Sequence, residues 1–529
     1  RQGDAIILYE RNRDTDNVTN KMVFKGNIEY LTENEIGIRL RATQQNPSVL
    51  PAESLYAIEH DTMDTTFRSM YQGLYIYLSA RKERRDLLLS QRPPRFDESL
   101  DSMISRSEDD FTRIALKAKA AQDYFLLIGP PGTGKTSCAL KKMVETFHAD
   151  KDAQILLLSY TNRAVDEICK SLASIAPAVD FIRVGSELSC DEAYRGHLIE
   201  NELSSCNRRS EVYERIRNCR IIVGTVAAIS GKPELFRLKH FDVAIIDEAT
   251  QILEPQLLGI LCARGEDGKD AIDKFVLIGD HKQLPAVVQQ NTEQSAIYDE
   301  SLLSIGLTNL KDSLFERLYR NCTATVHRSY DMLCRQGRMH PEVALFANRA
   351  FYGGRLIPVG LPHQIESSDT ICRLAFYPSV PEKAGASAKI NYSEARIVAD
   401  LAARIYEDHQ TDFDESRTLG IITPYRSQIA LIKKEIESLG IPALNRILVD
   451  TVERFQGSER DVIIYSFCVN YPYQLKFLSN LTEEEGVLID RKLNVALTRA
   501  RKQMFITGVP ELLERNPLYK SLLKLIESF

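Results

Sequence analysis

The sequence lacks any apolar run that approaches the ~18 residues a helix needs to cross a lipid bilayer. Its ten cysteines are scattered singly, without a C-x-x-C pair or a Cys/His group at the spacing of zinc ligands. These absences argue against membrane insertion, a disulfide framework and a structural zinc site. A reducing compartment inside the cell, cytoplasmic or nuclear, is the expected location.

The sequence also lacks a large excess of charge of one sign, because 67 Lys and Arg residues face 73 Asp and Glu residues for a net charge of -6. A protein that coats nucleic acid by bulk electrostatics would be strongly basic, so nucleic-acid binding here would need a local basic channel. With 529 residues the chain exceeds the roughly 250–300 residues of one compact core, and we expect three or four domains. No secretory or transit segment follows Arg1, so we expect a fragment of a longer chain, with room for an additional domain upstream.

The first 95 residues predict a small accessory module. Apolar residues at 36, 38 and 40 alternate with Gly and Arg, the period-two pattern of a half-buried strand, so we expect residues 1–66 to form a small β-barrel or sandwich. The apolar period then becomes helical, which predicts a helical stalk over residues 67–95 that ends near two prolines. The apolar face of that helix comprises Phe67, Met70, Tyr71, Leu74 and Leu78.

The rest of the chain predicts two α/β domains. Between residues 96 and 320 apolar runs alternate with helical patterns, as in a parallel sheet, at 125–128, 155–158, 221–223, 243–246 and 275–278. The polar stretch 186–219 lies between two of these runs and is predicted to be an insertion. Residues 321–529 repeat the pattern with strands predicted at 419–422, 462–465 and 505–507.

Residues 129–136 match the pattern G-x-x-x-x-G-K-[ST], directly after a predicted strand and before a helical pattern. Glycines let backbone N–H groups approach phosphate oxygens, and the N-terminus of the following helix adds its positive end. Lys135 would reach the β- and γ-phosphates of a nucleotide, and the Thr136 hydroxyl would bind Mg²⁺. The predicted cofactor-binding residues are Gly129, Pro130, Pro131, Gly132, Thr133, Gly134, Lys135 and Thr136.

A carboxylate pair follows the apolar run 243–246. Asp247 would hold Mg²⁺, and Glu248 would take a proton from an attacking water. An isolated Asp-Glu pair is more often a solvated acidic turn, but the strand before it and the upstream phosphate loop favour the catalytic interpretation. Gln283 follows the next predicted strand, where its amide could sense a γ-phosphate or the water.

Charge that develops on a transferred phosphoryl group usually needs an arginine from outside the phosphate-loop domain. The second α/β domain offers Arg338 and Arg499, both in helix-like contexts. A lone arginine is more often part of a surface ion pair. The catalytic interpretation of these two arginines therefore depends on the other motifs.

Together these motifs resemble superfamily 1 helicases of subclass B, in the branch of the nonsense-mediated-decay helicase and the replication nuclease-helicase. The resemblance spans nearly the whole chain. Its strings lie at residues 161–166, 224–225, 247–250, 279–285, 338–341, 423–426, 450–459 and 493–501. Several strings in the family's order are far more specific than a single phosphate loop.

The resemblance implies two RecA-like domains, 96–320 and 321–529, with ATP in the cleft between them. It also implies a β-barrel accessory domain over 1–66, a helical stalk over 67–95 and a second accessory element at 186–219. Arg338 and Arg499 would contact the γ-phosphate, Gln283 would couple it to domain closure, and Glu459 would hold the ribose.

Nucleic-acid contacts also carry over from the resemblance. Thr161, Asn162, Thr225 and Thr451 would touch the sugar-phosphate backbone through small hydroxyl and amide groups, which bind phosphate without reading sequence. Members of the branch move 5′ to 3′ on a single strand.

Two departures from the family's pattern concern the base of the nucleotide. Phe111 and Thr112 stand where the family has a glutamine that reads adenine, and Gly337 replaces a tyrosine that stacks on the base. We therefore expect weak selectivity for ATP over GTP or CTP.

The expected function is an ATP-dependent helicase or translocase that moves 5′ to 3′ on single-stranded nucleic acid, with DNA favoured over RNA. We expect a monomer that uses ATP and Mg²⁺ and does not bind membranes. One alternative is an ATP-dependent nucleic-acid clamp or ribonucleoprotein remodeller without processive unwinding. Another is a phosphate-loop kinase or similar phosphotransferase, against which the paired α/β domains and their two arginines argue.

Overall fold

The computed structural model describes residues 3–32, 34–42, 46–61, 65–288, 290–325, 328–367, 371–382, 387–484 and 486–528. The chain divides into two compact units. One comprises Arg1–Asp86, Lys151–Ala244 and Glu254–Asp273, and the other comprises Leu87–Asp150, Ile245–Leu253 and Lys274–Phe529. No described helix has both the length and the hydropathy of a membrane span.

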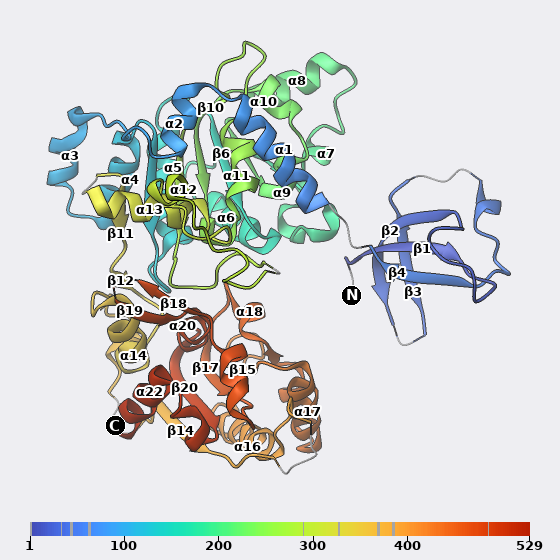
Figure 1. The fold of residues 1–529 in the computed structure, drawn as a ribbon, viewed down its shortest axis with the longest axis vertical. Coiled ribbons are helices and arrows are strands. Elements are labelled where there is room, and N and C mark those ends of the chain that lie inside the picture. The colour runs from blue at the N-terminus through green and yellow to red at the C-terminus, as the bar shows by residue number, and fades with distance from the viewer. Residues whose placement is uncertain are drawn as a thin grey trace. The chain divides into compact units, whose positions relative to one another are not determined.

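The N-terminal strands form an antiparallel sheet in the order β3-β2-β1-β4 (Figure 1). The strands are β1 (Ala5–Glu10), β2 (Val23–Leu31), β3 (Ile36–Leu40) and β4 (Tyr56–His60). Ile6, Leu8 and Ile28 form a small core on one face. The predicted strand-rich module is therefore present as an antiparallel sheet, and its closure into a barrel stays a prediction.

The helical segment after the sheet differs from the predicted stalk. It consists of two helices, α1 (Thr65–Ser79) and α2 (Lys82–Leu88), where one helix continuing to about residue 93 was expected. Helix α1 packs on α11 (Glu254–Leu261) through Gly73, where a Cβ atom would lie only 2.2 Å from the carbonyl oxygen of Pro255. Most of the predicted apolar face points to solvent instead, since these side chains are exposed: Phe67, Tyr71, Leu74 and Leu78.

A seven-stranded sheet has the order β11-β5-β10-β9-β6-β8-β7. The five predicted strands are confirmed as β5 (Tyr124–Ile128), β6 (Ile155–Ser159), β8 (Ile221–Thr225), β9 (Phe241–Ile246) and β10 (Ile272–Gly279). The edge strands β7 (Phe181–Val184) and β11 (Tyr330–Met332) were not predicted. In β7 the apolar run is interrupted by Arg183, which is buried and forms an ion pair with Asp166. Only three residues form β11.

Helices fill the connections of this part of the chain. The predicted insertion lies between β7 and β8 and contains α7 and α8. The helices are α3 (Asp101–Arg106), α4 (Asp110–Ala120), α5 (Lys141–His148), α6 (Asn162–Ala173), α7 (Ile199–Glu202), α8 (Arg209–Asn218), α9 (Val226–Ser230), α10 (Glu234–Leu238), α12 (Glu300–Ser304) and α13 (Leu314–Thr325).

A second sheet is parallel throughout and has the order β14-β20-β17-β15-β16. Its strands are β14 (Leu374–Pro378), β15 (Leu419–Ile422), β16 (Leu448–Asp450), β17 (Arg460–Ser466) and β20 (Ala500–Gly508). Three of these match the predicted strands. Two short ribbons accompany the sheet, β12 (Arg335–Gln336) with β13 (Ile357–Pro358) and β18 (Leu481–Glu484) with β19 (Val487–Asp490).

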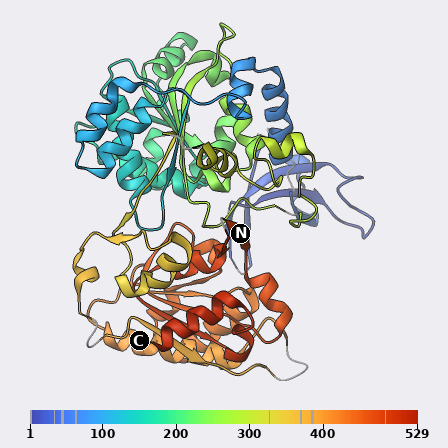
Figure 2. The same ribbon diagram turned by 60° about the vertical axis from the view of Figure 1, so that its left-hand side comes forward.

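Helices cover both faces of the second sheet (Figures 1 and 2). Val462 and Ile464 of β17 pack into one core with α16 (Tyr392–Asp408) and α17 (Arg426–Ser438). Ile463 and Tyr465 pack into the opposite core with α14 (Pro341–Tyr352), α20 (Arg491–Leu497) and α22 (Pro517–Glu527). The remaining helices are α15 (Pro362–Ile365), α18 (Val452–Phe455), α19 (Leu475–Leu478) and α21 (Pro510–Leu513). Both predicted α/β sheets are therefore confirmed.

Candidate nucleotide-binding site

The phosphate loop connects β5 to a helix that starts at Lys135 as a π-helical turn and continues into α5. Gly132 and Gly134 both have a φ of +75°, a conformation that side chains other than glycine rarely adopt. The Thr133 hydroxyl donates a hydrogen bond to the Pro130 carbonyl at 2.7 Å and fixes the turn. The strand, loop and helix that the motif requires are all present.

Lys135 forms an ion pair with Glu248, the predicted general base. Its Nζ lies 2.7 Å from Oε1 of Glu248, and both side chains are largely buried. Burial opposes the charged form of Lys135, but the carboxylates of Glu248 and Asp247 outweigh it and raise the pKa of the lysine. The ammonium group is therefore held charged where a nucleotide's phosphates would enter.

The two neighbouring carboxylates are in different electrostatic environments. Burial, followed by the charge of Glu248, raises the pKa of Asp247. Burial also acts on Glu248, but the charge and hydrogen bond of Lys135 dominate and lower its pKa. Glu248 is thus an ionised carboxylate, the form that a general base needs.

The residues predicted to hold Mg²⁺ are adjacent. The Thr136 hydroxyl donates to Oδ2 of Asp247 at 2.5 Å. A hydroxyl and a carboxylate are oxygen ligands of the kind that Mg²⁺ prefers. Burial and the charge of Glu248, which raise the pKa of Asp247, are both effects that a divalent cation would offset, so the pair fits such an ion.

Glu248 sits in a strained turn at the end of β9. Its φ is +53°, a left-handed conformation that is uncommon for a residue with a side chain and concentrates at functional sites. Its backbone N–H donates to Oδ1 of Asp247 at 2.9 Å, and Nε2 of Gln251 donates to its Oε2 at 2.8 Å. The backbone and Gln251 together fix the direction of the Glu248 carboxylate.

The second sheet contributes Arg499, which reaches the predicted sensor. Its guanidinium donates to Oε1 of Gln283 at 3.2 Å, and its Nε donates to the Val495 carbonyl at 2.9 Å. Burial and the neighbouring Arg338 lower the pKa of Arg499 to about 9, which leaves it charged at neutral pH. A buried positive charge that touches the sensor amide is suited to stabilise charge on a transferred phosphoryl group.

Gln283 itself is held by residues that the sequence interpretation missed. Its Nε2 donates to Oδ2 of Asp280 at 2.7 Å, and the Tyr352 hydroxyl donates to the same oxygen at 2.7 Å. Asp280 and Tyr352 are almost fully buried. Asp280 lies inside the motif string 279–285, so its position in the sequence could have indicated that it belongs to the site. Tyr352 lies in no motif, so the sequence carried no signal for it.

Arg338 lies against the phosphate loop. The Gly337 N–H donates to the Gly132 carbonyl at 2.8 Å, and a Cβ atom at Gly132 would lie 2.4 Å from the Cβ of Arg338. Nε of Arg338 donates to Oε2 of Glu459 at 2.6 Å, and Nε of Arg501 lies 3.7 Å from Oε1 of the same glutamate. The ribose contact expected for Glu459 stays a prediction.

The structure thus brings the predicted catalytic residues together within one compact unit, with contacts that join the phosphate loop, the carboxylates and both arginines. Glu248 can accept a proton. Lys135, Arg338 and Arg499 can balance negative charge. This is the arrangement of groups that hydrolysis of a phosphoanhydride requires.

The predicted nucleic-acid contacts occupy helix starts. The hydroxyl of Thr161 accepts from the Ala164 N–H at 3.2 Å at the start of α6, of which Asn162 is the first residue. The hydroxyl of Thr225 accepts from the Ala228 N–H at 3.1 Å. The capping hydrogen bond is by itself a sufficient structural reason for a threonine at each of these two positions. Thr451 precedes α18 in the other unit without a side-chain cap bond, and all four contacts stay predictions.

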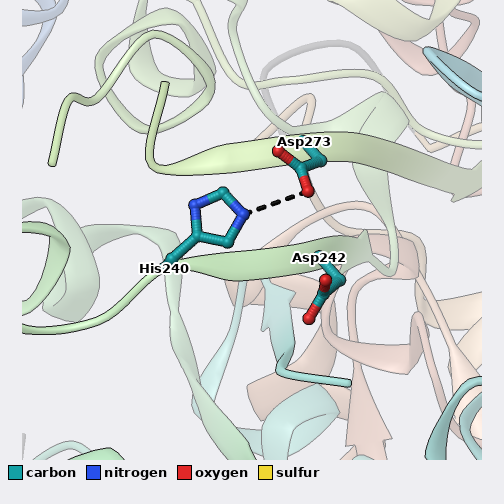
Figure 3. A group of neighbouring side chains, drawn as sticks. All are labelled: His240, Asp242 and Asp273. Atoms are coloured by element: carbon teal, nitrogen blue, oxygen red, sulfur yellow. Dashed lines mark ion pairs between the residues drawn. The ribbon is translucent and has the colours of Figure 1, made fainter. Parts of the chain in front are cut away.

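One group in the described part of the chain could also hold a metal ion: His240, Asp242 and Asp273 (Figure 3). Nε2 of His240 lies 3.0 Å from Oδ2 of Asp273, and both side chains are exposed. Asp242 already accepts the Gln154 N–H at 2.6 Å. A surface ion pair accounts for this geometry.

Two protein-family profiles match the chain. Both are described as an AAA domain. One matches residues 310–511, and the other matches residues 106–212 and 199–291. Together they span the phosphate loop, the carboxylate pair and both arginines.

Curated relatives match nearly the whole chain. The DNA replication ATP-dependent helicase/nuclease JHS1 of Arabidopsis thaliana is 28% identical over 100% of this chain and 38% of its own length. The helicase/nuclease DNA2 of Homo sapiens is 28% identical over 90% of this chain and 46% of its own length. The DNA polymerase alpha-associated DNA helicase A of Saccharomyces cerevisiae is 24% identical over 87% of this chain and 73% of its own length. The chain thus spans less than half the length of the two helicase/nucleases.

A solved structure of an arterivirus helicase, nonstructural protein 10 in complex with DNA, is 14% identical and covers 79% of this chain and 65% of that chain, with a TM-score of 0.37. The sequence matches and the site point to one class: the chain is similar to ATP-hydrolysing helicases of superfamily 1. Within that superfamily its similarity is to the branch of the replication helicase/nucleases named above.

Proposed function

We propose that this enzyme translocates 5′ to 3′ on single-stranded DNA and separates duplexes ahead of it. The observation that carries the proposal is the contact between Arg499 and Gln283, because it joins a residue between α20 and β20 of the second sheet to a residue after β10 of the first sheet. Residues from two sheets that share one nucleotide site can convert hydrolysis into relative movement of those sheets.

The proposed residue roles are those of the sequence motifs, and the geometry of the site supports them. Lys135 binds phosphates, Thr136 and Asp247 hold Mg²⁺, Glu248 activates water, and Arg338 and Arg499 stabilise the transferred charge. Thr161, Asn162, Thr225 and Thr451 are proposed to contact the strand's backbone. Such contacts to phosphate should make affinity fall as salt rises.

The choice of DNA follows the names of the similar proteins, since the helicase/nucleases and DNA helicase A all act on DNA by name. The 5′ to 3′ direction rests on the resemblance in the motif strings. We also propose that the protein acts as a monomer inside the cell.

The test measures ATPase and strand separation on four substrates: 5′-tailed and 3′-tailed duplexes of DNA and of RNA. The proposal predicts nucleic-acid-stimulated hydrolysis, with unwinding of the 5′-tailed DNA duplex. Unwinding of the 3′-tailed duplex alone would overturn the direction. Stimulated hydrolysis without strand separation would instead indicate a clamp or remodeller, and hydrolysis independent of nucleic acid would indicate a phosphotransferase.

A further inference from the structure

A short helical segment after β17 carries two exposed aromatic residues, and a third, half-buried one precedes it. The rings of Tyr471 and Tyr473 stack with centroids 5.8 Å apart and planes inclined by only 13°. Tyr473 is 55% exposed and Phe477 is 69% exposed. Phe477 follows Tyr473 by one helical turn, so both side chains lie on the same side of the segment.

The folding of this segment does not require these rings. Its inward side is anchored by Leu475 and Leu478, which belong to the buried core under α14 and α22. Burying further aromatic surface would stabilise the domain, yet Tyr473 and Phe477 face solvent. An exposed aromatic cluster of this kind marks an interaction surface.

Buried hydrogen bonds hold the segment in place. Gln474 is only 2% exposed, and its Oε1 accepts the backbone N–H groups of Asn470 and Tyr471, each at 2.9 Å. Its Nε2 donates to the Ala388 carbonyl at 2.8 Å and to the Tyr425 hydroxyl at 3.1 Å. The aromatic rings are therefore presented by a rigid support, which lowers the entropy cost of binding.

The segment lies at the edge of the sheet where a strand is proposed to bind. Strands β15, β16 and β17 are parallel neighbours, so the loops that follow them leave from the same edge. Thr451 follows β16, Tyr425 follows β15, and the aromatic segment follows β17. Exposed Lys476 lies between Tyr473 and Phe477, and exposed Arg426 follows Tyr425.

We propose that Tyr471, Tyr473 and Phe477 form a stacking platform for unpaired bases of a single nucleic-acid strand, with Lys476 beside its phosphates. The proposal rests on the proposed function and adds to it a site for the bases. Aromatic faces accept every base, so the platform grips the strand without reading its sequence. Each lost stack should weaken binding by about fivefold or more.

The absence of tryptophan from the whole chain gives a direct test. In a Tyr473→Trp variant the new tryptophan is the only one, and stacking on a base should quench its fluorescence. The probe is a single-stranded DNA oligonucleotide, compared with one of equal length in which abasic sites replace the bases. We expect quenching by the first and little by the second. A Tyr298→Trp variant is the matched control, since Tyr298 is also exposed, at 82%, but lies between β10 and β11 of the first sheet. Its fluorescence should not distinguish the two oligonucleotides.

Affinity gives the second readout. The Tyr473→Ala/Phe477→Ala variant, which loses two stacks, should bind the base-containing oligonucleotide at least about 25-fold more weakly than wild type and the abasic one equally well. Its hydrolysis of ATP without nucleic acid should be unchanged. If wild type binds the oligonucleotide and this variant binds it equally tightly, the platform is refuted and the proposed function stands, and the aromatic surface would then suit a protein partner. If wild type binds neither oligonucleotide, the proposed function falls and the platform falls with it.

Discussion

Nζ of Lys135 lies 2.7 Å from Oε1 of Glu248, so the residue proposed to bind phosphate and the residue proposed to activate water neutralise each other. A nucleotide that enters the loop must draw the lysine away from the glutamate. Nucleotide binding therefore changes the charge around the Glu248 carboxylate just before hydrolysis.

Glu248→Gln separates binding from chemistry. The amide cannot accept the proton of the attacking water, so hydrolysis should fall by roughly 10²–10⁴-fold. ATP binding should be retained or slightly tightened, because Lys135 is no longer held by a carboxylate. Single-turnover hydrolysis and binding of a fluorescent ATP analogue measure the two effects, and near-normal hydrolysis would refute the role of Glu248 as base.

Lys135→Ala should weaken nucleotide binding and also destabilise the fold. Two buried carboxylates, Asp247 and Glu248, then lose their cation, and breaking a buried ion pair in this way costs about 3–5 kcal/mol. Adding Glu248→Gln should restore much of the stability but none of the nucleotide binding. Chemical denaturation of both variants checks this; equal stability of the two would contradict the buried pairing.

Arg499→Ala should reduce the hydrolysis rate by about 10³-fold or more while changing the ATP KM little, because the guanidinium stabilises charge that develops during the reaction. Arg499→Lys should not recover the rate, since one ammonium cannot reproduce the bonds to Gln283 and Val495 together. A double-mutant cycle with Gln283→Ala tests the contact. Strictly additive effects would show that the arginine and the amide act independently.

Glu394 makes stability depend on pH. This carboxyl is fully buried, and burial raises its pKa from 4.5 to about 7 although Ser466 donates to Oε2 at 2.6 Å and the Cys468 N–H donates to it at 2.8 Å. Its stabilising contribution is complete below pH 4.5 and is lost as the pH rises through about 7.

Glu394→Gln mimics the protonated carboxyl and should remove this dependence. Wild type should therefore lose up to about 3 kcal/mol relative to the variant between pH 5 and pH 8.5. Urea unfolding of both proteins across that range measures the difference. A constant difference in unfolding free energy at all pH values would contradict the raised pKa.

Base selectivity is the fifth test. Gly337 provides no ring to stack on a base, and the Thr112 hydroxyl is engaged with Oδ2 of Asp109 at 2.6 Å. We therefore expect ATP, GTP and CTP to be hydrolysed with kcat/KM values within about tenfold of one another. A tenfold ratio corresponds to a free-energy difference of only ~1.4 kcal/mol. A steady-state preference for ATP of a hundredfold or more would refute this.

The sequence predicts features that are local in the chain. The strand β5, the phosphate loop and the helix after it form one continuous pattern, and so do β9 and its carboxylates. The features that were missed or wrong depend on contacts between distant residues. Arg183 can lie inside strand β7 only because Asp166 neutralises it. Tyr352 joins the site through its hydrogen bond to Asp280, which lies 72 residues away.

Helix α1 shows the same limitation for packing. Its hydrophobic period predicts which residues share a face, but Gly73 decides which face meets α11, because only a residue without a side chain allows that approach to Pro255. A count of apolar residues cannot reveal a contact that depends on the absence of a side chain. The two sheet-edge strands were missed for other reasons, because Arg183 interrupts the apolar run of β7 and β11 has only three residues.

The backbone hydrogen bond from the Gly337 N–H to the Gly132 carbonyl makes this amide proton sensitive to separation of the second sheet's residues from the phosphate loop. Whenever the second sheet's arginines withdraw from the phosphate loop, that bond must open and its proton must meet water. The rate of hydrogen exchange at Gly337 during steady-state turnover would then report the average fraction of time for which the two halves of the site are apart.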